Sequence, residues 1–403
     1  MEKIMENSPF KHIVVLMMEN QSFDRIFGFT KGLGKLTGQE YNLNSKGEKV
    51  YITKGADPYK NHSFDPPHSY QATYKSLYGE DFVDKVSKLK NEDSINIAYP
   101  EHDEEGEKKY MQFFAEEDNH LPAITTLAKN FVVCDRWFSS MPGPTGPNRL
   151  FVHGASSYGY AGSSYKASDL PLPDSCESIF ESLENNGRSW RTYIHENLNT
   201  SHAFPFVKAR PQNHFKMADF YSDAKLDNLP DYSFLGPDLY AESQHPGEKF
   251  LGSMARGDLL IANVYEAIRS NQTVWEKTLL VINYDEAGGY YDSVSPELNV
   301  TCPPFVNEDN WPPSENRAFD FSVLGVRVPG LLISAWHDHN IDHTVYEHSS
   351  IPASLKKHFD LKGRGPNGFL TCRDENANDI FSQNTLRKTP RNDLPTLPKP
   401  VIR

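Results

Sequence analysis

The stretch that decides the fold is Thr278-Leu-Leu-Val-Ile-Asn-Tyr284, an apolar run that stops at Asp285-Glu286-Ala-Gly-Gly289. Seven residues of this composition, bounded by glycine, predict a buried strand. The pattern recurs twice: residues 12–18 stop at Glu19-Asn20, and residues 131–135 lead into a Pro/Gly loop. In an open parallel sheet, the residues just past the carboxyl ends of the strands converge on one crevice. We therefore expect the polar residues after these three strands to share one site.

The rest of the chain alternates strand runs with helical patterns, which predicts a layered α/β fold with a mostly parallel sheet. We expect one domain over residues 1–403, with insertions at about 30–115 and 295–320 that cover the edge of the sheet. Residues 200–245 show no clear periodicity. Helices are expected at residues 22–28, 121–129, 178–186, 249–270 and 350–359, and further strands at residues 189–194 and 326–336.

The charge and the apolar runs limit the partners of the chain. A net charge of −13 disfavours nucleic acid, whose binding depends on cationic contacts to phosphate. It is compatible with peripheral contact to a membrane, because zwitterionic lipids require no basic patch. No stretch reaches the roughly 18 to 20 apolar residues of a membrane span, and no signal peptide is visible. We expect a soluble protein, cytoplasmic or peripheral to a membrane, with the compartment left open.

The Pro/Gly loop Pro142-Gly-Pro-Thr145-Gly-Pro-Asn148-Arg149 carries a candidate nucleophile. A helix is expected to begin near Pro147 or Asn148, and free N–H groups at its start favour an anionic phosphate. The Thr145 hydroxyl could attack phosphorus if a metal lowered its pKa. The planar donors of Arg149 suit phosphate oxygens. The alternative is a Thr that only caps a helix, and on this segment alone the cap is the better interpretation.

The pairs Glu19-Asn20 and Asp285-Glu286 indicate a metal site. Neighbouring carboxylates repel each other unless a cation lies between them, and hard oxygen ligands suit Ca²⁺, Mg²⁺ or Mn²⁺. The alternative is that Asn20 or Asp285 caps the helix that follows. Two such pairs together with the Thr145 loop favour the metal.

Histidines occur in three loops. His68, in Asp65-Pro-Pro-His68, and His245, in Gln244-His245-Pro246, are candidates to protonate a leaving alcohol, although taken alone each is more typical of a surface or turn histidine. The run His337-Asp-His-Asn-Ile-Asp-His343 has the composition of a second metal cluster, but we interpret it as a solvated loop.

Six segments together resemble the phosphoesterase family of nonspecific phospholipases C and bacterial acid phosphatases. They occur in the family's order and span nearly the whole chain: Glu19-Asn-Gln-Ser-Phe-Asp-Arg-Ile-Phe-Gly28, Asp65-Pro-Pro-His-Ser69, Thr145-Gly-Pro-Asn-Arg149, Tyr284-Asp-Glu-Ala-Gly-Gly-Tyr-Tyr-Asp292, Leu324-Gly-Val-Arg-Val-Pro329 and Glu347-His-Ser-Ser-Ile-Pro352. The resemblance implies an alkaline-phosphatase-like three-layer fold with one catalytic domain.

The resemblance also assigns roles to residues. It implies a divalent metal held by Glu19, Asn20, Asp285 and Glu286, with Thr145 as the covalent nucleophile. His68 and His245 match histidines around the phosphate and the leaving group, and Arg149 is expected to stabilise the phosphoryl oxygens. Within the matching segments, Asn148 and Asp65 are expected to bind substrate.

The expected function is hydrolysis of glycerophospholipids to diacylglycerol and a phosphorylated head group through a phosphothreonine. One alternative is a broad acid phosphatase that acts on monoesters. The other is a weakened phospholipid-binding protein, because the family commonly has histidines where Ala287 and Ser293 stand.

Overall fold

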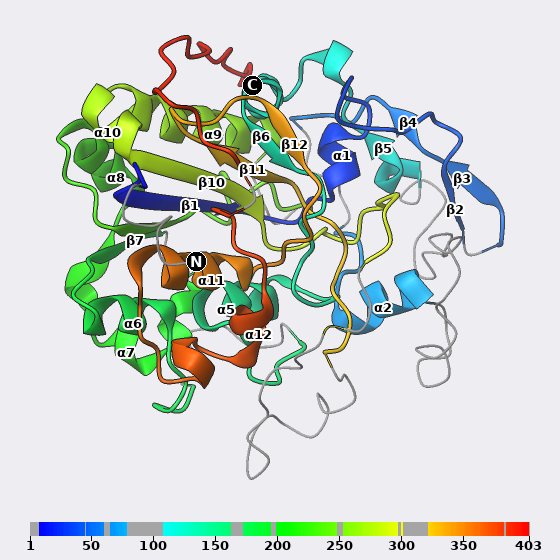
Figure 1. Cartoon of the computed structure of the whole chain (residues 1–403). Helices are drawn as coiled ribbons and strands as arrows, with labels where there is room; N and C mark the ends of the chain where they lie inside the picture. Colours follow the sequence, from blue (N-terminus) through cyan, green and yellow to red (C-terminus); the bar gives the residue numbers. More distant parts are fainter. Residues whose placement is uncertain are drawn as a thin grey trace.

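The structure is a computed structural model that describes residues 8–44, 46–59, 65–78, 108–162, 172–194, 199–247, 253–296, 300, 321–382 and 384–402. Its largest element is an eight-stranded sheet in the order β12-β6-β11-β10-β1-β9-β7-β8 (Figure 1). The strands are β1 (His12–Met18), β6 (Val132–Cys134), β7 (Trp190–Ile194), β8 (His214–Phe215), β9 (Tyr232–Gly236), β10 (Thr278–Tyr284), β11 (Gly330–Ile333) and β12 (Asn340–Asp342).

Seven of these strands run in the same direction, and only β11 is antiparallel to its neighbours β10 and β6. The register of β1 on β10 is continuous from His12 opposite Thr278 to Met18 opposite Tyr284. Both strands are almost entirely buried, as expected for strands covered on both faces. Because they end level with each other, the residues that follow them emerge side by side. The expectation of an α/β fold with a mostly parallel sheet is confirmed.

Helices cover both faces of the sheet (Figure 1). One group packs around α9, and the other packs around α5. The first group contains α4 (Pro122–Asn130), α8 (Met217–Lys225), α9 (Met254–Arg269) and α10 (Gln272–Lys277). The second contains α5 (Thr145–Gly154), α6 (Ile179–Asn185), α7 (Pro205–Lys208), α11 (Ser350–Phe359) and α12 (Cys372–Asn376). No helix within the described ranges is long and apolar enough to cross a membrane.

Smaller elements lie beside the carboxyl end of β1, in the region expected as an insertion. The helix α1 (Phe23–Phe27) begins at Ser22, whose hydroxyl accepts from the Arg25 N–H. Two short sheets follow, one of β2 (Tyr41–Leu43) with β3 (Lys49–Tyr51), the other of β4 (Thr53–Lys54) with β5 (Gln112–Phe113). The helix α2 (Tyr70–Tyr78) comes shortly after His68. Residues 79–107 and 301–320, and so much of both expected insertions, lie outside the described residues.

Four expectations about single elements need correction. Strand β9 lies in the stretch where no periodicity was visible, because its five residues are all buried and show no alternation. The loop from His337 to His343 contains the edge strand β12, which pairs with β6. Strand β11 is four residues long, much shorter than the expected strand at 326–336. Helix α5 begins at Thr145, two residues earlier than expected.

Candidate active site

Four strand ends bring the candidate residues together, as the topology requires. Glu19 and Asn20 follow β1, and Asp285 and Glu286 follow the adjacent strand β10. His245 lies in the loop after β9, on the other side of β1. Thr145 opens α5, which follows β6. The polar crevice expected at the carboxyl ends of the strands is therefore present.

The Thr145 hydroxyl points at the residues that end β1. Its Oγ1 lies 3.1 Å from Glu19 Oε2 and 3.4 Å from Asn20 Oδ1, and it can donate to either oxygen. Pro144 is the N-cap of α5 and makes no side-chain capping bond. Thr145 is thus the first residue of the helix, and its hydroxyl is directed at the carboxylates. The capping alternative for Thr145 is not what the structure shows.

Arg149 lies one turn further along α5 and is fully buried. Its Nη2 is 2.7 Å from Glu19 Oε1, its Nε is 3.0 Å from Asp285 Oδ2, and Nη2 also donates to the carbonyls of Met17 and Met18. We expected this guanidinium to contact phosphate oxygens. In the structure it joins the ends of β1 and β10 to α5, because the nearest anions are the two carboxylates.

The three carboxylates of the crevice have different proton affinities. Burial raises the pKa of Glu19 well above its usual range, and neighbouring Asp285 adds to the rise while Arg149 opposes it. Burial and then Asp285 likewise raise the pKa of Glu286. Burial alone would also raise the pKa of Asp285, but Arg149 and hydrogen bonds from its neighbours lower it overall. The site therefore holds more buried negative charge than one guanidinium balances.

This imbalance fits a divalent cation. Glu286 Oε1 is buried and has no hydrogen-bond partner among the described residues. Among the described residues, the hydrogen-bond donor to Glu19 Oε2 and to Asn20 Oδ1 is the Thr145 hydroxyl. Hard oxygen donors of this kind suit Ca²⁺, Mg²⁺ or Mn²⁺. Asp285 already accepts from Arg149, Asn20 and Glu286 N–H groups, and its part in holding a cation stays a prediction.

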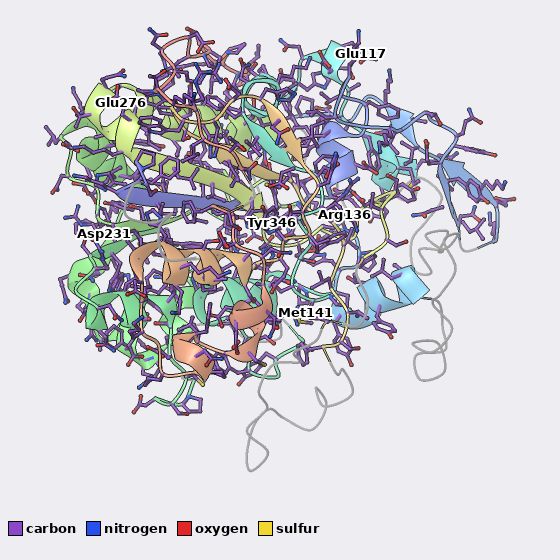
Figure 2. The ribbon with its side chains drawn as sticks, in the orientation of Figure 1. Glu117, Arg136, Met141, Asp231, Glu276 and Tyr346 are labelled. Atoms are coloured by element: carbon purple, nitrogen blue, oxygen red, sulfur yellow. The ribbon has the colours of Figure 1, made fainter. Side chains whose placement is uncertain are left out.

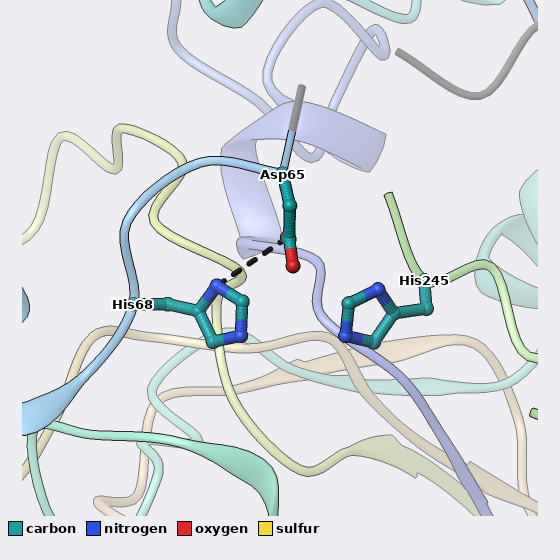
Figure 3. Close-up of side chains that lie close together, drawn as sticks. All are labelled: Asp65, His68 and His245. Atoms are coloured by element: carbon teal, nitrogen blue, oxygen red, sulfur yellow. Dashed lines mark ion pairs between the residues drawn. The ribbon is translucent and has the colours of Figure 1, made fainter. Parts of the chain in front are cut away.

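The two histidines lie together on the other side of Asn20, with ring centroids 5.7 Å apart (Figure 3). His68 Nδ1 is 2.6 Å from the Pro66 carbonyl, and His245 Nδ1 is 2.6 Å from the Pro246 carbonyl. Since a carbonyl can only accept, both Nδ1 atoms carry a proton. The Asn20 amide bridges the two halves of the site, because its Nδ2 lies 3.4 Å from His68 Nε2.

His245 is held neutral by its surroundings. Burial lowers its pKa to about 3, and His68 contributes to the shift. Asp65 lies 3.5 Å from His68, and Asp65, His68 and His245 offer atoms within 4.8 Å of one another, close enough to hold a metal ion (Figure 3). A second cation position, next to the carboxylates, is therefore compatible with the geometry.

The His337–His343 run does not gather into a metal cluster. His337 contacts Ser334, His339 contacts the Phe131 carbonyl, and His343 pairs with Asp135. Their ring nitrogens are thus used in three separate places, partly because β12 spreads the run along the sheet edge. The interpretation of this run as a solvated loop stays a prediction.

Asn148 does not contact the crevice, contrary to the expectation that it binds substrate. Its Oδ1 accepts from the Met141 N–H, and its Nδ2 donates to the carbonyls of Met141, Gly143 and Pro144. Met141, labelled in Figure 2, opens the loop that ends at Thr145. The fully buried amide therefore shapes the loop that carries the hydroxyl.

Two supports of the site escaped the sequence analysis. Gln244, with φ +73°, accepts from the Tyr284 hydroxyl at 2.5 Å and donates to the Met254 carbonyl, which fixes the backbone immediately before His245. His348, just before α11, has its Nε2 2.7 Å from the Asp285 carbonyl and so holds the backbone of Asp285 in place. Only the matching segment around Glu347 pointed to His348, and no local pattern pointed to Gln244.

The two positions noted as departures from the family pattern, Ala287 and Ser293, directly follow the acids Glu286 and Asp292. Ala287 is buried and lines a cavity together with Glu286. The Ser293 N–H donates to Asp24, whose carboxylate pairs with Arg327. Arg327 also pairs with Asp292, so this second buried ion network lies directly under the Asp285–Asp292 loop.

Known proteins resemble this chain over nearly its whole length. The model of the Phosphoesterase family matches residues 10–362. Non-specific phospholipase C1 of Arabidopsis thaliana is 35% identical over 420 residues, covering 96% of this chain and 73% of its own. Phospholipase C B of Mycobacterium tuberculosis strain H37Rv is 28% identical over 444 residues, covering 97% and 81%. Among solved structures, the phosphonate monoester hydrolase of Agrobacterium radiobacter aligns over 87% of this chain and 74% of its own, at 8% identity and with a TM-score of 0.39.

Proposed function

The chain belongs to the phosphoesterase family, and from that premise we propose that it is a phospholipase C that cleaves glycerophospholipids to diacylglycerol and a phosphorylated head group. The observation that carries the proposal is the Thr145 hydroxyl, placed at the start of α5 and 3.1 Å from the buried Glu19 carboxylate. The names of the curated relatives, phospholipases C, support the lipid substrate.

In the proposed reaction the Thr145 oxygen attacks phosphorus and displaces the diacylglycerol oxygen. Glu19 Oε2 and Asn20 Oδ1 orient the hydroxyl, and its proton is lost to solvent as the bond to phosphorus forms. The N–H groups at the start of α5 face the phosphoryl oxygens. Water then attacks the phosphothreonine, releases the phosphorylated head group and restores the hydroxyl.

The leaving alcohol needs a proton, and His68 and His245 are the proposed donors. Each ring donates from Nδ1 to a backbone carbonyl, which leaves Nε2 as the atom that can pass a proton to the leaving oxygen. A phosphate anion beside the rings favours the protonated form of His245, whose pKa burial lowers, so that substrate binding itself loads the acid. Asp65, 3.5 Å from His68, supports the same charge. We expect Asp65 to act through His68.

A divalent cation, held by Glu19, Asn20, Asp285 and Glu286, would lower the pKa of the hydroxyl and neutralise charge on the phosphoryl oxygens. Arg149 keeps Glu19 and Asp285 in place for this role by joining them to α5. The metal content of wild type, Glu286→Gln and His245→Gln, measured by mass spectrometry, distinguishes this ligand set from the Asp65, His68 and His245 group. Loss of metal only in His245→Gln would contradict our choice.

The test of function is release of diacylglycerol from vesicles of phosphatidylcholine and phosphatidylethanolamine, by wild type and Thr145→Ala, with and without a chelator. We expect release by wild type alone and a decrease with the chelator. Hydrolysis of p-nitrophenyl phosphate without lipid turnover would move the assignment to a monoester phosphatase. Vesicle binding without any turnover would instead support the weakened lipid-binding protein, and full activity in the variant would refute the nucleophile.

A further inference from the structure

The loop that leads to Thr145 starts in a buried polar cluster that has no part in the reaction as proposed. The Ser140 cluster consists of Ser140, Glu347, His348 and Arg373, all of them buried. The Ser140 hydroxyl donates to the Glu347 carboxylate and accepts from the His348 N–H at 3.1 Å. The Ser140 carbonyl accepts from Arg373 Nη2 at 2.7 Å. Three hydrogen bonds to Ser140 therefore fix the start of this loop.

Arg373 makes its bond to Ser140 from α12, which lies beyond residue 362, where the match to the family model ends. Its side chain is 2% exposed, and its Nε lies 3.1 Å from Glu347 Oε1. Thr371, the N-cap of α12, donates from its hydroxyl to the carbonyl of Ala155, the C-cap of α5, at 3.0 Å. The start of α12 is therefore bonded both to the loop before α5 and to the residue after it.

The charge of Arg373 keeps Glu347 ionised. Burial alone would raise the pKa of Glu347, but Arg373 and the Ser140 hydroxyl lower it overall. As an anion, the carboxylate accepts from the Ser140 hydroxyl and, at 2.8 Å, from the Ser349 N–H. Without the guanidinium, burial favours the neutral carboxyl, whose hydrogen bonds to these two donors are weaker. Loss of Arg373 therefore removes its own bond to the loop and weakens the bond that Glu347 makes.

We propose that Arg373 is a positioning residue, which holds the loop that starts at Ser140, and with it the Thr145 hydroxyl, in place against the end of β1. The proposal rests on the proposed function, because it takes Thr145 as the nucleophile. Arg373 contacts no reacting group and acts through Ser140. The Ser140 cluster also reaches the end of β10, because the ring of His348 contacts the Asp285 carbonyl. One buried cluster therefore sets the nucleophile and the neighbouring acids relative to each other.

The first test measures kcat and KM separately with a soluble p-nitrophenyl phosphoester. Because a misplacement of about 1 Å costs about 10²-fold in rate, we expect Arg373→Met to lower kcat by about that factor. The ratio kcat/KM should fall with it while KM changes little, the pattern of an interaction realised in the transition state. Arg373→Lys keeps a cation beside Glu347, and with it the fold, but lacks the planar fork, so we expect a loss of about tenfold. An unchanged kcat in the two variants would overturn the inference.

Arg391→Met is the matched control. Arg391 is 7% exposed, pairs with Asp393 and donates to the Asn130 carbonyl, so it resembles Arg373 in burial and in the kinds of its partners. Asn130 ends α4 just before β6 and so lies at the edge of the sheet opposite to the crevice. We expect this variant to unfold at lower urea concentration and to keep the kcat of wild type. An equal fall of kcat in Arg373→Met and Arg391→Met would contradict the role of Arg373.

Hydrogen exchange tests the loop without any turnover. The amides of the peptide 139–149, followed by mass spectrometry, should exchange faster in Arg373→Met than in wild type and at the wild-type rate in Arg391→Met. Unchanged exchange in Arg373→Met would overturn the inference. Faster exchange in that variant, together with no turnover of any phosphoester by wild type, would refute the proposed function and leave Arg373 as the residue that holds this loop.

Discussion

Replacement of Arg149 by methionine tests whether the buried ion cluster holds the site together. The change removes a guanidinium with no exposed surface and leaves Glu19 and Asp285 without their cationic partner. Loss of one partner from a buried pair costs about 3–5 kcal/mol, since a charge stays buried without compensation. Urea unfolding should show this loss as a lower midpoint, with an unchanged slope.

The loss should depend on pH in a defined direction. Without Arg149, the pKa of Glu19, which burial already holds above its unfolded value of about 4.3, rises further, and the pKa of Asp285 rises above its unfolded value of about 3.9. The folded variant then binds protons more tightly than the unfolded chain, so its stability falls as pH rises above those values. We expect a larger difference between variant and wild type at pH 8 than at pH 5.

Arg210→Met is the control, because Arg210 pairs with Glu184 at the surface, where both side chains are partly exposed. Such a pair is worth about 0–1 kcal/mol. Addition of Mg²⁺ or Ca²⁺ should stabilise Arg149→Met more than wild type if the same carboxylates bind the cation. A cost of less than 1 kcal/mol at pH 8, equal to that of the control, would refute the account of Arg149 as the link between β1, β10 and α5.

Three further outcomes are expected. Thr145→Val should lower turnover of a soluble phosphoester by at least about 10³-fold while Thr145→Ser keeps measurable activity, because only the hydroxyl is needed; equal rates for the two would contradict the nucleophile. Gly257→Ala should lower the free energy of unfolding by about 1–3 kcal/mol, because the new Cβ would lie 2.2 Å from Gln244 Cγ. Alanine normally favours a helix over glycine, so a gain in stability would contradict this steric argument. Burial raises the pKa of Asp258 to about 7, so the stability that its proton contributes is present below the unfolded pKa of about 3.9 and is lost as pH rises through 7. The urea midpoint of Asp258→Asn should therefore fall less between pH 5 and pH 8 than the midpoint of wild type. Parallel pH profiles for the two proteins would contradict this.

The sequence was most informative where a strand is long and its end is polar. The seven-residue strands β1 and β10 and the acids after them were predicted because apolar runs of that length stop abruptly at charged residues. Strand β9 was missed, because five buried residues in Tyr232–Gly236 carry no alternation. Pairing with β1 and β7 decides its conformation, and such pairing cannot be read from a local pattern.

The sequence predicted which residues lie in the candidate site better than it predicted what each side chain contacts. Glu19 and Thr145 meet because the strands β1 and β6 that precede them end at the same edge of the sheet, and Asn20 contacts His68 from a separate loop. The direction in which Arg149 and Asn148 point depends on the nearest acceptors in the folded protein, and these come from residues far away in the sequence. The roles proposed for these residues in the reaction stay predictions.

The backbone of Asn20 limits how this site can evolve. Asn20 has φ +56°, a left-handed conformation that asparagine tolerates and that is unfavourable for most other side chains. Its amide also faces Thr145 on one side and His68 on the other. A replacement must therefore satisfy two independent requirements at once, one of the main chain and one of the amide. Glycine would meet the requirement of the main chain but not that of the amide. We therefore expect relatives to differ in the residues around Asn20 and to keep the asparagine itself.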